Sequence, residues 1–190
     1  MNSLLAIDTE TGGLDPQRHA LLSIAAHHPL HGEFSAFIRP APCKIIDPEA
    51  ARVNGYTPEL WEKKGAVELW DAIISFQCWL NALPLRITPL AHHAGFDRSF
   101  LSQACQETVT LMPQLNCRWE CSQAATAFMM RAGMIDAENA SLDSLCAWAG
   151  IPRPAVHDAL EDARACHLGY TMLLRAATAP RRLTPLSIAH

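Results

Sequence analysis

The sequence predicts a single α/β domain with a mixed β-sheet, in which an antiparallel three-strand meander is joined by parallel strands and flanked by helices. The chain has 190 residues, of which 49% are hydrophobic and 18% charged. This size and composition suffice for one globular core. Three apolar runs with short links fill the first forty residues, and helical and strand patterns alternate after them. That order is typical of an α/β domain with a mixed sheet.

The first three strands are predicted at "SLLAIDTE", "HALLSIAAHH" and "EFSAFIRP". Turn-forming segments, "TGGLDPQ" and residues 29–32, separate them. Such short links favour antiparallel neighbours. Two later strands are predicted at "LRITPLAHH", where Pro89 weakens the pattern, and at "LNCRWEC".

Helices are predicted after Pro40. "DPEAARVNG" has an Asp-Pro start and a Gly stop, which indicates a short helix. A long helix follows in "AVELWDAIISFQCWLNAL", where helical spacing connects Val67, Trp70, Ile74, Cys78 and Leu80 or Asn81. Further helices are predicted at "RSFLSQACQE", at "SQAATAFMMRAG" closed by Gly133, at "SLDSLCAWAG" from Ser141 to Gly150, and from about 158 to 177.

The domain is predicted to span residues 1–177, and residues 178–190 form a loose tail or docking arm. The formal charge of −4 gives no indication of a broad basic surface for duplex nucleic acid, so any nucleic-acid contact should be local. Seven cysteines without a C-x-x-C motif argue against a disulfide framework and a paired zinc site. We interpret Cys117 and Cys121 as small core residues rather than half a metal site.

The location expected from the sequence is the cytoplasm. No apolar stretch reaches the ~18–20 residues that a membrane span needs. The first residues, "MNSLLAID", lack the basic region and cleavage site of a signal peptide. Free cysteines also suit a reducing compartment.

Four carboxylates stand at the ends of predicted elements. Asp8 and Glu10 end the first strand at an i, i+2 spacing, which places them on one face. Alone, such a pair is often just solvated, but the apolar strand before it indicates a central strand, whose end is a usual ligand site. Asp97 follows another strand and is either a helix N-cap or a site residue. Asp162 lies inside the last helix, where Asp is unfavourable unless engaged.

These four carboxylates could converge, and they would then repel one another. At an effective dielectric of about 20, two unit charges ~4 Å apart repel by ~4 kcal/mol. Protons or cations must therefore neutralise the cluster. Hard divalent ions with oxygen ligands, Mg²⁺ or Mn²⁺, suit such donors, and two of them ~3.5–4 Å apart can act on a phosphodiester.

Three segments carry a resemblance to a known family. "DTETGGL", "HHAGFD" and "HDALEDA", in this order, resemble the three motifs of the DnaQ-like DEDDh 3′–5′ exonucleases, within the RNase H-like superfamily. The resemblance spans roughly residues 4 to 175. It implies an RNase H-like fold and hydrolysis of nucleic acid from the 3′ end to 5′-mononucleotides with two divalent ions. Asp8, Glu10 and Asp162 resemble the direct metal ligands, and Asp97 the ligand that acts mainly through water.

His157 resembles the general base that takes a proton from the attacking water. Its unperturbed pKa near 6.5 suits that role. An offset of five residues places His157 and Asp162 on different faces of a helix. However, Asp158 is a favoured N-cap residue and Glu161 follows three positions later, so the helix should begin after Asp158. His157 would then lie on a loop, movable relative to Asp162.

The resemblance also implies positions that hold the substrate. Thr9, Thr11 and Gly12 resemble those that hold the terminal nucleotide, and Leu14 resembles the apolar wedge against the last bases. "VNGYTPELW", residues 53–61, resembles a loop that lines the same pocket. Tyr56 or Trp61 could stack on a base, although a core position is at least as reasonable for Trp61.

The remaining histidines receive no catalytic role. His93 stands where many relatives have an asparagine that supports the fold near the site, and we leave it out of the catalytic set. His19, His27, His28 and His31 are interpreted as ordinary polar positions.

The function predicted from these residues is a divalent-metal-dependent 3′–5′ exonuclease acting on single-stranded DNA or RNA. The alternative is a catalytically silent module that binds nucleic-acid ends or a polymerase. Retention of all five polar motif residues argues against the silent module, since nothing else requires a repulsive cluster. No residue in the sequence can be identified as one that contacts the sugar 2′-OH, so DNA and RNA are both candidate substrates. A homodimer or a polymerase partner is compatible with the sequence.

Overall fold

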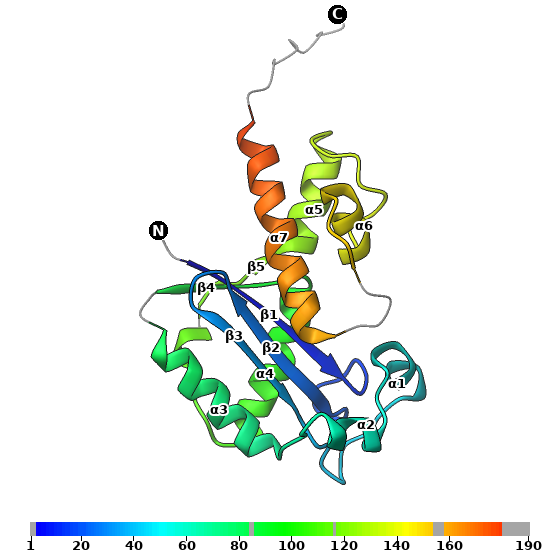
Figure 1. Cartoon of the computed structure of the whole chain (residues 1–190), viewed down its shortest axis with the longest axis vertical. Helices are drawn as coiled ribbons and strands as arrows, with labels where there is room; N and C mark the ends of the chain where they lie inside the picture. The colour runs from blue at the N-terminus through cyan, green and yellow to red at the C-terminus, as the bar shows by residue number, and fades with distance from the viewer. Residues whose placement is uncertain (1–2, 84–85, 116, 154–157, 180–190) are drawn as a thin grey trace, which may run out of the picture.

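The computed structural model describes residues 3–83, 86–115, 117–153 and 158–179 (Figure 1). Its mixed sheet has the strand order β3-β2-β1-β4-β5. The strands are β1 (Ser3–Thr11), β2 (Leu21–His28), β3 (Gly32–Phe37), β4 (Ile87–Ala91) and β5 (Glu120–Cys121). The first three pair antiparallel, whereas β4 runs parallel to β1 and β5 parallel to β4. The predicted fold class is confirmed.

Helices cover both faces of this sheet (Figure 1). Helix α7 packs over β1 and β2 on one face, and α3 and α4 pack on the other. Helices α1 and α2 lie near the carboxyl end of β1 (Figure 1), while α5 and α6 pack beside α7. Their bounds are α1 (Pro48–Asn54), α2 (Pro58–Lys63), α3 (Leu69–Ala82), α4 (Ala94–Glu107), α5 (Ser122–Arg131), α6 (Leu142–Ala149) and α7 (Ala159–Thr178), with a 3₁₀ turn at Pro113–Leu115.

Strand β1 is central because both of its faces are apolar. Leu5 and Ile7 point into the core shared with α3 and α4, whereas Ala6 points into the core shared with α5, α6 and α7. This alternation continues to the end of the strand. Because β4 is parallel to β1, the carboxyl ends of both strands meet at the same edge.

The predicted helix ends are confirmed where local capping decides them. Gly55 and Gly150 adopt the left-handed conformation after α1 and α6, with φ values of 68° and 69°. The Ser141 hydroxyl accepts from the Ser144 amide at the start of α6. Helix α7 begins at Ala159, because the Asp158 carboxylate accepts from the two amides that follow Ala159. His157, predicted to lie just before this cap, is outside the described residues.

Three predictions of local structure are wrong. In α3, the buried face consists of Ala72, Ile73, Phe76 and Leu80, whereas Trp70 is 56% exposed. This segment is apolar on several sides, so periodicity could not choose the face that β3 and α4 cover. The segment 53–61 is not a plain loop, since α2 begins inside it with Thr57 as its cap. The strand predicted at "LNCRWEC" is reduced to Glu120–Cys121.

Some assignments of single side chains also change. Cys117 is exposed, so the core interpretation fails for it, while Cys121 is half-buried against the core. His19 and His28 are buried, which ordinary polar positions would not be. All seven cysteines are free thiols. Within the described residues, no helix is both long and apolar enough to cross a membrane.

Candidate active site

Three carboxylates meet at the carboxyl end of β1. Asp8 and Glu10 lie on the same face of the strand as Ala6, toward α7, and Asp162 lies in the first turn of α7. One carboxylate oxygen from each lies within 4.8 Å of the others. The structure thus brings together residues separated by most of the chain.

The fourth carboxylate reaches the same strand end from the opposite face. Thr9 points toward α4, and both its amide and its hydroxyl donate to Oδ1 of Asp97, at 3.1 and 2.9 Å. Asp97 is only 3% exposed. It is not the N-cap of α4, because that position belongs to His93 and Asp97 lies one turn further on. The N-cap alternative for Asp97 is therefore excluded.

Burial and mutual repulsion disfavour full ionisation of this cluster. Burial raises the pKa of Asp8 well above its usual range, and the charges of Asp97, Glu10 and Asp162 raise it further. Burial, followed by the charge of Asp162, raises the pKa of Glu10 to about 8. Burial also raises the pKa of Asp97, although the Thr9 hydrogen bonds oppose this shift. A bound cation would favour the ionised forms.

Arg153 stands beside these carboxylates, and the sequence reasoning missed it. Its Nη2 donates to Oδ1 of Asp162 at 2.7 Å, and its Nε lies 3.2 Å from Oδ1 of Asp143. Its positive charge lowers the pKa values of Asp8 and Glu10, against the larger effect of burial. The only sequence signal was a basic residue between two prolines, four positions before His157.

A cavity of about 350 Å³ opens over the four carboxylates. Its lining comes from the ends of β1 and β4, from the first turns of α4, α5, α6 and α7, and from Arg153 after α6. The residues around it are Asp8, Thr9, Glu10, His92, His93, Phe96, Asp97, Gln123, Ser141, Leu142, Asp143, Arg153 and Asp162. His93, left without a role by the sequence, is an exposed member of this lining.

A second cavity adjoins it, lined in part by Thr9, Glu10 and Phe96, which the two share. Leu14 lies on its rim with its side chain 83% exposed, and Val53 of α1 faces it. An apolar side chain this exposed, beside a polar site, is a surface available to a ligand.

Thr11 and Gly12, also predicted to hold the nucleotide, form hydrogen bonds to neighbouring loops of the chain. The Thr11 hydroxyl donates to the carbonyl of Gly13. Gly12 donates its amide to Ala20 and accepts from the amide of Asp47. A Cβ at Gly12 would lie 2.7 Å from the Ile45 carbonyl, so this close approach requires glycine.

The two aromatic candidates lie apart from both cavities. Tyr56 packs edge-on against Trp61, with ring centroids 5.0 Å apart, and lines neither cavity. Trp61 is 2% exposed and donates Nε1 to the Leu22 carbonyl, which is the core arrangement. Asn54, which sequence reasoning did not single out, is buried and donates to the Thr11 carbonyl, so it fixes the turn after β1.

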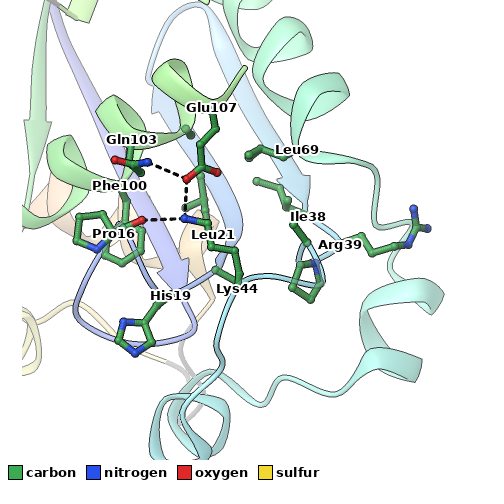
Figure 2. Close-up of a pocket in the computed structure, with 14 residues that line it drawn as sticks. Pro16, His19, Leu21, Ile38, Arg39, Lys44, Leu69, Phe100, Gln103 and Glu107 are labelled. Carbon is green, nitrogen blue, oxygen red and sulfur yellow. Dashed lines mark hydrogen bonds and ion pairs between the residues drawn. The ribbon is translucent and has the colours of Figure 1, made fainter. Parts of the chain in front are cut away.

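Lys44 anchors the outer side of the same turn (Figure 2). Its Nζ donates to the carbonyls of Pro16 and Gln17, at 3.1 and 3.0 Å, and lies 2.5 Å from Oε1 of Glu107 on α4. Gln103 donates to the same carboxylate oxygen. The turn that carries Leu14 is thus tied to the helix that carries Asp97.

A sequence model of the family described as Exonuclease matches residues 5–168, which is most of the chain. The chain belongs to the Exonuclease family. This confirms the resemblance to DnaQ-like 3′–5′ exonucleases, and the matched region contains Asp8, Glu10, Asp97 and Asp162.

Curated relatives in this family include large and small proteins. DNA polymerase III PolC-type proteins of Thermotoga petrophila and Thermotoga maritima are each 27% identical over 166 residues, which is 85% of this chain and 11% of theirs. Ribonuclease T of Baumannia cicadellinicola subsp. Homalodisca coagulata is 33% identical over 119 residues, which is 55% of this chain and 54% of that protein. The chain therefore spans about a tenth of the first relatives and about half of the last.

Solved structures share the fold. Exonuclease I of E. coli in complex with a dT13 oligonucleotide superposes with a TM-score of 0.75 at 18% identity, over 92% of this chain and 41% of that one. Exonuclease I of Methylocaldum szegediense gives a TM-score of 0.76 at 21% identity, over 94% and 41%. The Exonuclease-family chain described here thus has the RNase H-like architecture that the motifs implied.

Proposed function

We propose that this chain is a divalent-metal-dependent 3′–5′ exonuclease that hydrolyses the terminal phosphodiester bond of single-stranded DNA or RNA and releases 5′-mononucleotides. The observation that carries the proposal is the approach of Asp8, Glu10 and Asp162 to within 4.8 Å at the end of the central strand. Family membership supports the same reaction class.

The donors fit Mg²⁺ or Mn²⁺. Asp8, Glu10 and Asp162 offer only carboxylate oxygens, the ligands that hard divalent ions prefer, and no thiolate stands among them. Asp97 would complete the set from α4. When bound, two such ions supply charge stabilisation to the attacking and leaving oxygens of a phosphodiester.

The side chains around this cluster hold it in place. Thr9 keeps Asp97 turned toward β1 through two hydrogen bonds. Asp158 caps α7 and so keeps Asp162 one turn from the helix start. His157, which immediately precedes this cap in the sequence, is proposed as the general base that accepts the proton of the attacking water, as in the DEDDh motif.

The second cavity suits the terminal nucleotide. Leu14, Val53 and Phe96 give it an apolar lining for a base, next to the carboxylates where the phosphate must sit. In this proposal Thr9, Thr11 and Gly12 shape the pocket, and Tyr56 acts behind it through Trp61. The net charge of −4 suits a single-stranded end better than a long duplex.

The substrate, the partners and the cellular location belong to the same proposal. The relatives include a ribonuclease and DNA polymerases, and the fold is shared with an exonuclease bound to an oligonucleotide, so both DNA and RNA ends are proposed substrates. A homodimer or a polymerase partner is proposed on the same grounds. Free cysteines suit the cytoplasm proposed for this chain.

The test uses oligonucleotides labelled at either end, as DNA and as RNA, with Mg²⁺ or Mn²⁺. We expect an oligonucleotide labelled at its 3′ end to release its label as a 5′-mononucleotide at once, whereas one labelled at its 5′ end should shorten stepwise. Asp8→Ala and His157→Ala should each reduce the rate by at least about a hundredfold. Asp71→Ala on helix α3 is the matched control, since it removes a carboxylate that is exposed and lies outside the cluster.

Three outcomes would contradict the proposal. Products released from the 5′ end would exclude the polarity. Folded protein that binds the oligonucleotides without releasing mononucleotides under either ion would support the silent binding module instead. Asp8→Ala and His157→Ala variants that are both as active as wild type would place the active site elsewhere.

A further inference from the structure

Arg153 has an unusual position for a cation that only balances charge. Its side chain is 10% exposed, and its partner Asp162 is 6% exposed. Among the described residues that line the carboxylate cavity, Arg153 is the one lysine or arginine. His92, which also lines it, is kept neutral because burial lowers its pKa to about 4.

The guanidinium is held firmly on one side only. Nη2 donates to Asp162, and Nε lies close to the carboxylate of Asp143 but without the alignment of a hydrogen bond. Nη1 is buried and has no hydrogen-bond partner among the residues that the structure describes. Buried donors without partners are unfavourable, so their persistence in a cavity points to a ligand that supplies the acceptor.

Backbone restriction adds to this fixed placement. Prolines precede and follow Arg153 in the sequence, which limits the conformations open to it. The prolines restrict the backbone of Arg153, while the bond from Nη2 to Asp162 and the nearby Asp143 carboxylate hold its guanidinium at the cavity. Pre-positioned arginine is the usual protein group for phosphate oxygens, because its planar donors match their geometry.

We propose that Arg153 binds the phosphate of the 3′-terminal nucleotide, with Nη1 donating to a non-bridging oxygen while Nη2 remains on Asp162. This inference rests on the proposed function, since it requires a nucleotide phosphate over the carboxylate cluster. Arg153 would then set the position of the phosphate relative to the ligands in β1 and α7.

The competing explanation is a counter-ion that merely offsets the repulsion among the carboxylates. A counter-ion would act on the cluster whether or not the ligand carries a phosphate. A phosphate-binding residue would act only on ligands that carry one. Thymidine 5′-monophosphate and thymidine separate these two cases, because they differ only in the phosphate.

The experiment measures the affinity of each ligand by calorimetry for wild type, Arg153→Gln, Arg153→Met and Arg153→Lys. Each protein is held at a Mg²⁺ concentration that saturates it, because removal of Arg153 should itself change Mg²⁺ affinity. Arg131→Gln, at the exposed end of α5, is the control for loss of one positive charge. Thermal unfolding verifies that each variant is folded.

We expect Arg153→Gln and Arg153→Met to weaken the affinity for the monophosphate by about tenfold or more, while the affinity for thymidine changes less than about twofold. Arg153→Lys should retain part of the affinity, and Arg131→Gln should match wild type. If one neutral variant does not fold, the other carries the same test. Equal weakening of both ligands, or an unchanged affinity for the monophosphate, would overturn the inference.

The outcome is separable from that of the proposed function. Wild-type protein that releases mononucleotides from 3′ ends, together with an Arg153→Gln variant of unchanged monophosphate affinity, would refute only the role of Arg153. Wild-type protein that neither cleaves oligonucleotides nor binds the monophosphate would refute the function itself.

Discussion

Thr9 donates twice to one carboxylate oxygen of Asp97, from its amide at 3.1 Å and from its hydroxyl at 2.9 Å. Its neighbours Asp8 and Glu10 point to the other face of the same strand. One three-residue segment therefore presents two carboxylates itself and holds a third from another element. The position of Asp97 relative to the cluster depends on this contact.

The first prediction concerns the Thr9 hydroxyl. Thr9→Val preserves the shape of the side chain but removes the 2.9 Å bond, leaving only the amide to orient Asp97. We expect the turnover of a labelled oligonucleotide to fall by about tenfold, in proportion to one hydrogen bond to a charged group. Thr108→Val, which removes a hydroxyl bond to a backbone carbonyl at the end of α4, should leave turnover unchanged. Similar losses in both variants would contradict this role.

The second prediction is a loss of stability at alkaline pH in the metal-free protein. Burial raises the pKa of Glu10 from about 4.5 to about 8. A carboxyl whose pKa is raised on folding favours the folded state when protonated, so its contribution is complete below pH 4.5 and is lost as the pH rises toward 8. Glu10→Gln cannot ionise and should not show this loss.

The measurement is urea unfolding in EDTA between pH 4.5 and 8.5, for wild type and Glu10→Gln. The free energy of unfolding of wild type should fall relative to that of the variant across the window. A constant difference between the two would show that Glu10 titrates normally. Comparison of the two proteins removes the contribution of every other titrating group.

The third prediction tests the anchor formed by Lys44 (Figure 2). Its side chain is 12% exposed and binds two carbonyls of the turn after β1 as well as Glu107. Lys44→Met should lower the free energy of unfolding by about 2 kcal/mol, because two carbonyls and the Glu107 carboxylate lose a donor whose own side chain is nearly buried. Gln103 still donates to Glu107, which limits the loss.

The control for Lys44 is Arg52→Met in α1. Arg52 and Glu49 form an exposed pair at i, i+3, with side chains 71% and 74% exposed, and such pairs contribute less than about 1 kcal/mol. Denaturant unfolding of both variants gives the comparison. Equal effects would mean that Lys44 is no more than a surface charge.

The fourth prediction concerns acid opening of the β2–β3 turn. His28 is 1% exposed, and its Nδ1 accepts from the amides of Leu30 and His31, both at 3.1 Å. Nε2 must then carry the proton shared with Ser3, so the buried ring is neutral. Burial lowers the pKa of His28 from its ordinary 6.5. The contribution of His28 to the free energy of unfolding is therefore complete above pH 6.5 and is lost as the pH falls below that value.

Hydrogen exchange at the Leu30 and His31 amides reports this opening. Their protection factors should fall between pH 7.5 and 5 in wild type. His28→Asn retains an acceptor near the position of Nδ1 but does not titrate, so its protection should be lower overall and nearly independent of pH. An equal pH dependence in the two proteins would assign the opening to another group.

Local signals in the sequence predicted much of the scaffold. Short turns marked the antiparallel meander, and caps at Ser141 and Asp158 fixed where α6 and α7 begin. The order of three motifs indicated the family. The turns, the caps and each single motif depend on residues within a few positions of one another, so they can be recognised without the fold.

Other features depend on contacts that no local pattern encodes. Thr9 was assigned to the nucleotide, yet its hydroxyl holds Asp97, which is 88 positions away. The buried face of α3 was misjudged, because several of its sides are apolar and only β3 and α4 decide which one is covered. Tyr56 was a stacking candidate, and only the fold shows that its ring packs edge-on against Trp61.

By itself, the sequence predicted the antiparallel three-strand meander joined by parallel strands, the starts of α6 and α7, and the four carboxylates of the candidate site. Tertiary structure alone decided that Asp97 is held by Thr9, and that Arg153 joins Asp162 while its Nε and Nη1 have no hydrogen-bond partner among the described residues. The physical reason is range. Hydrophobic period and capping act along the chain, whereas charge pairing and burial depend on which elements the fold brings together.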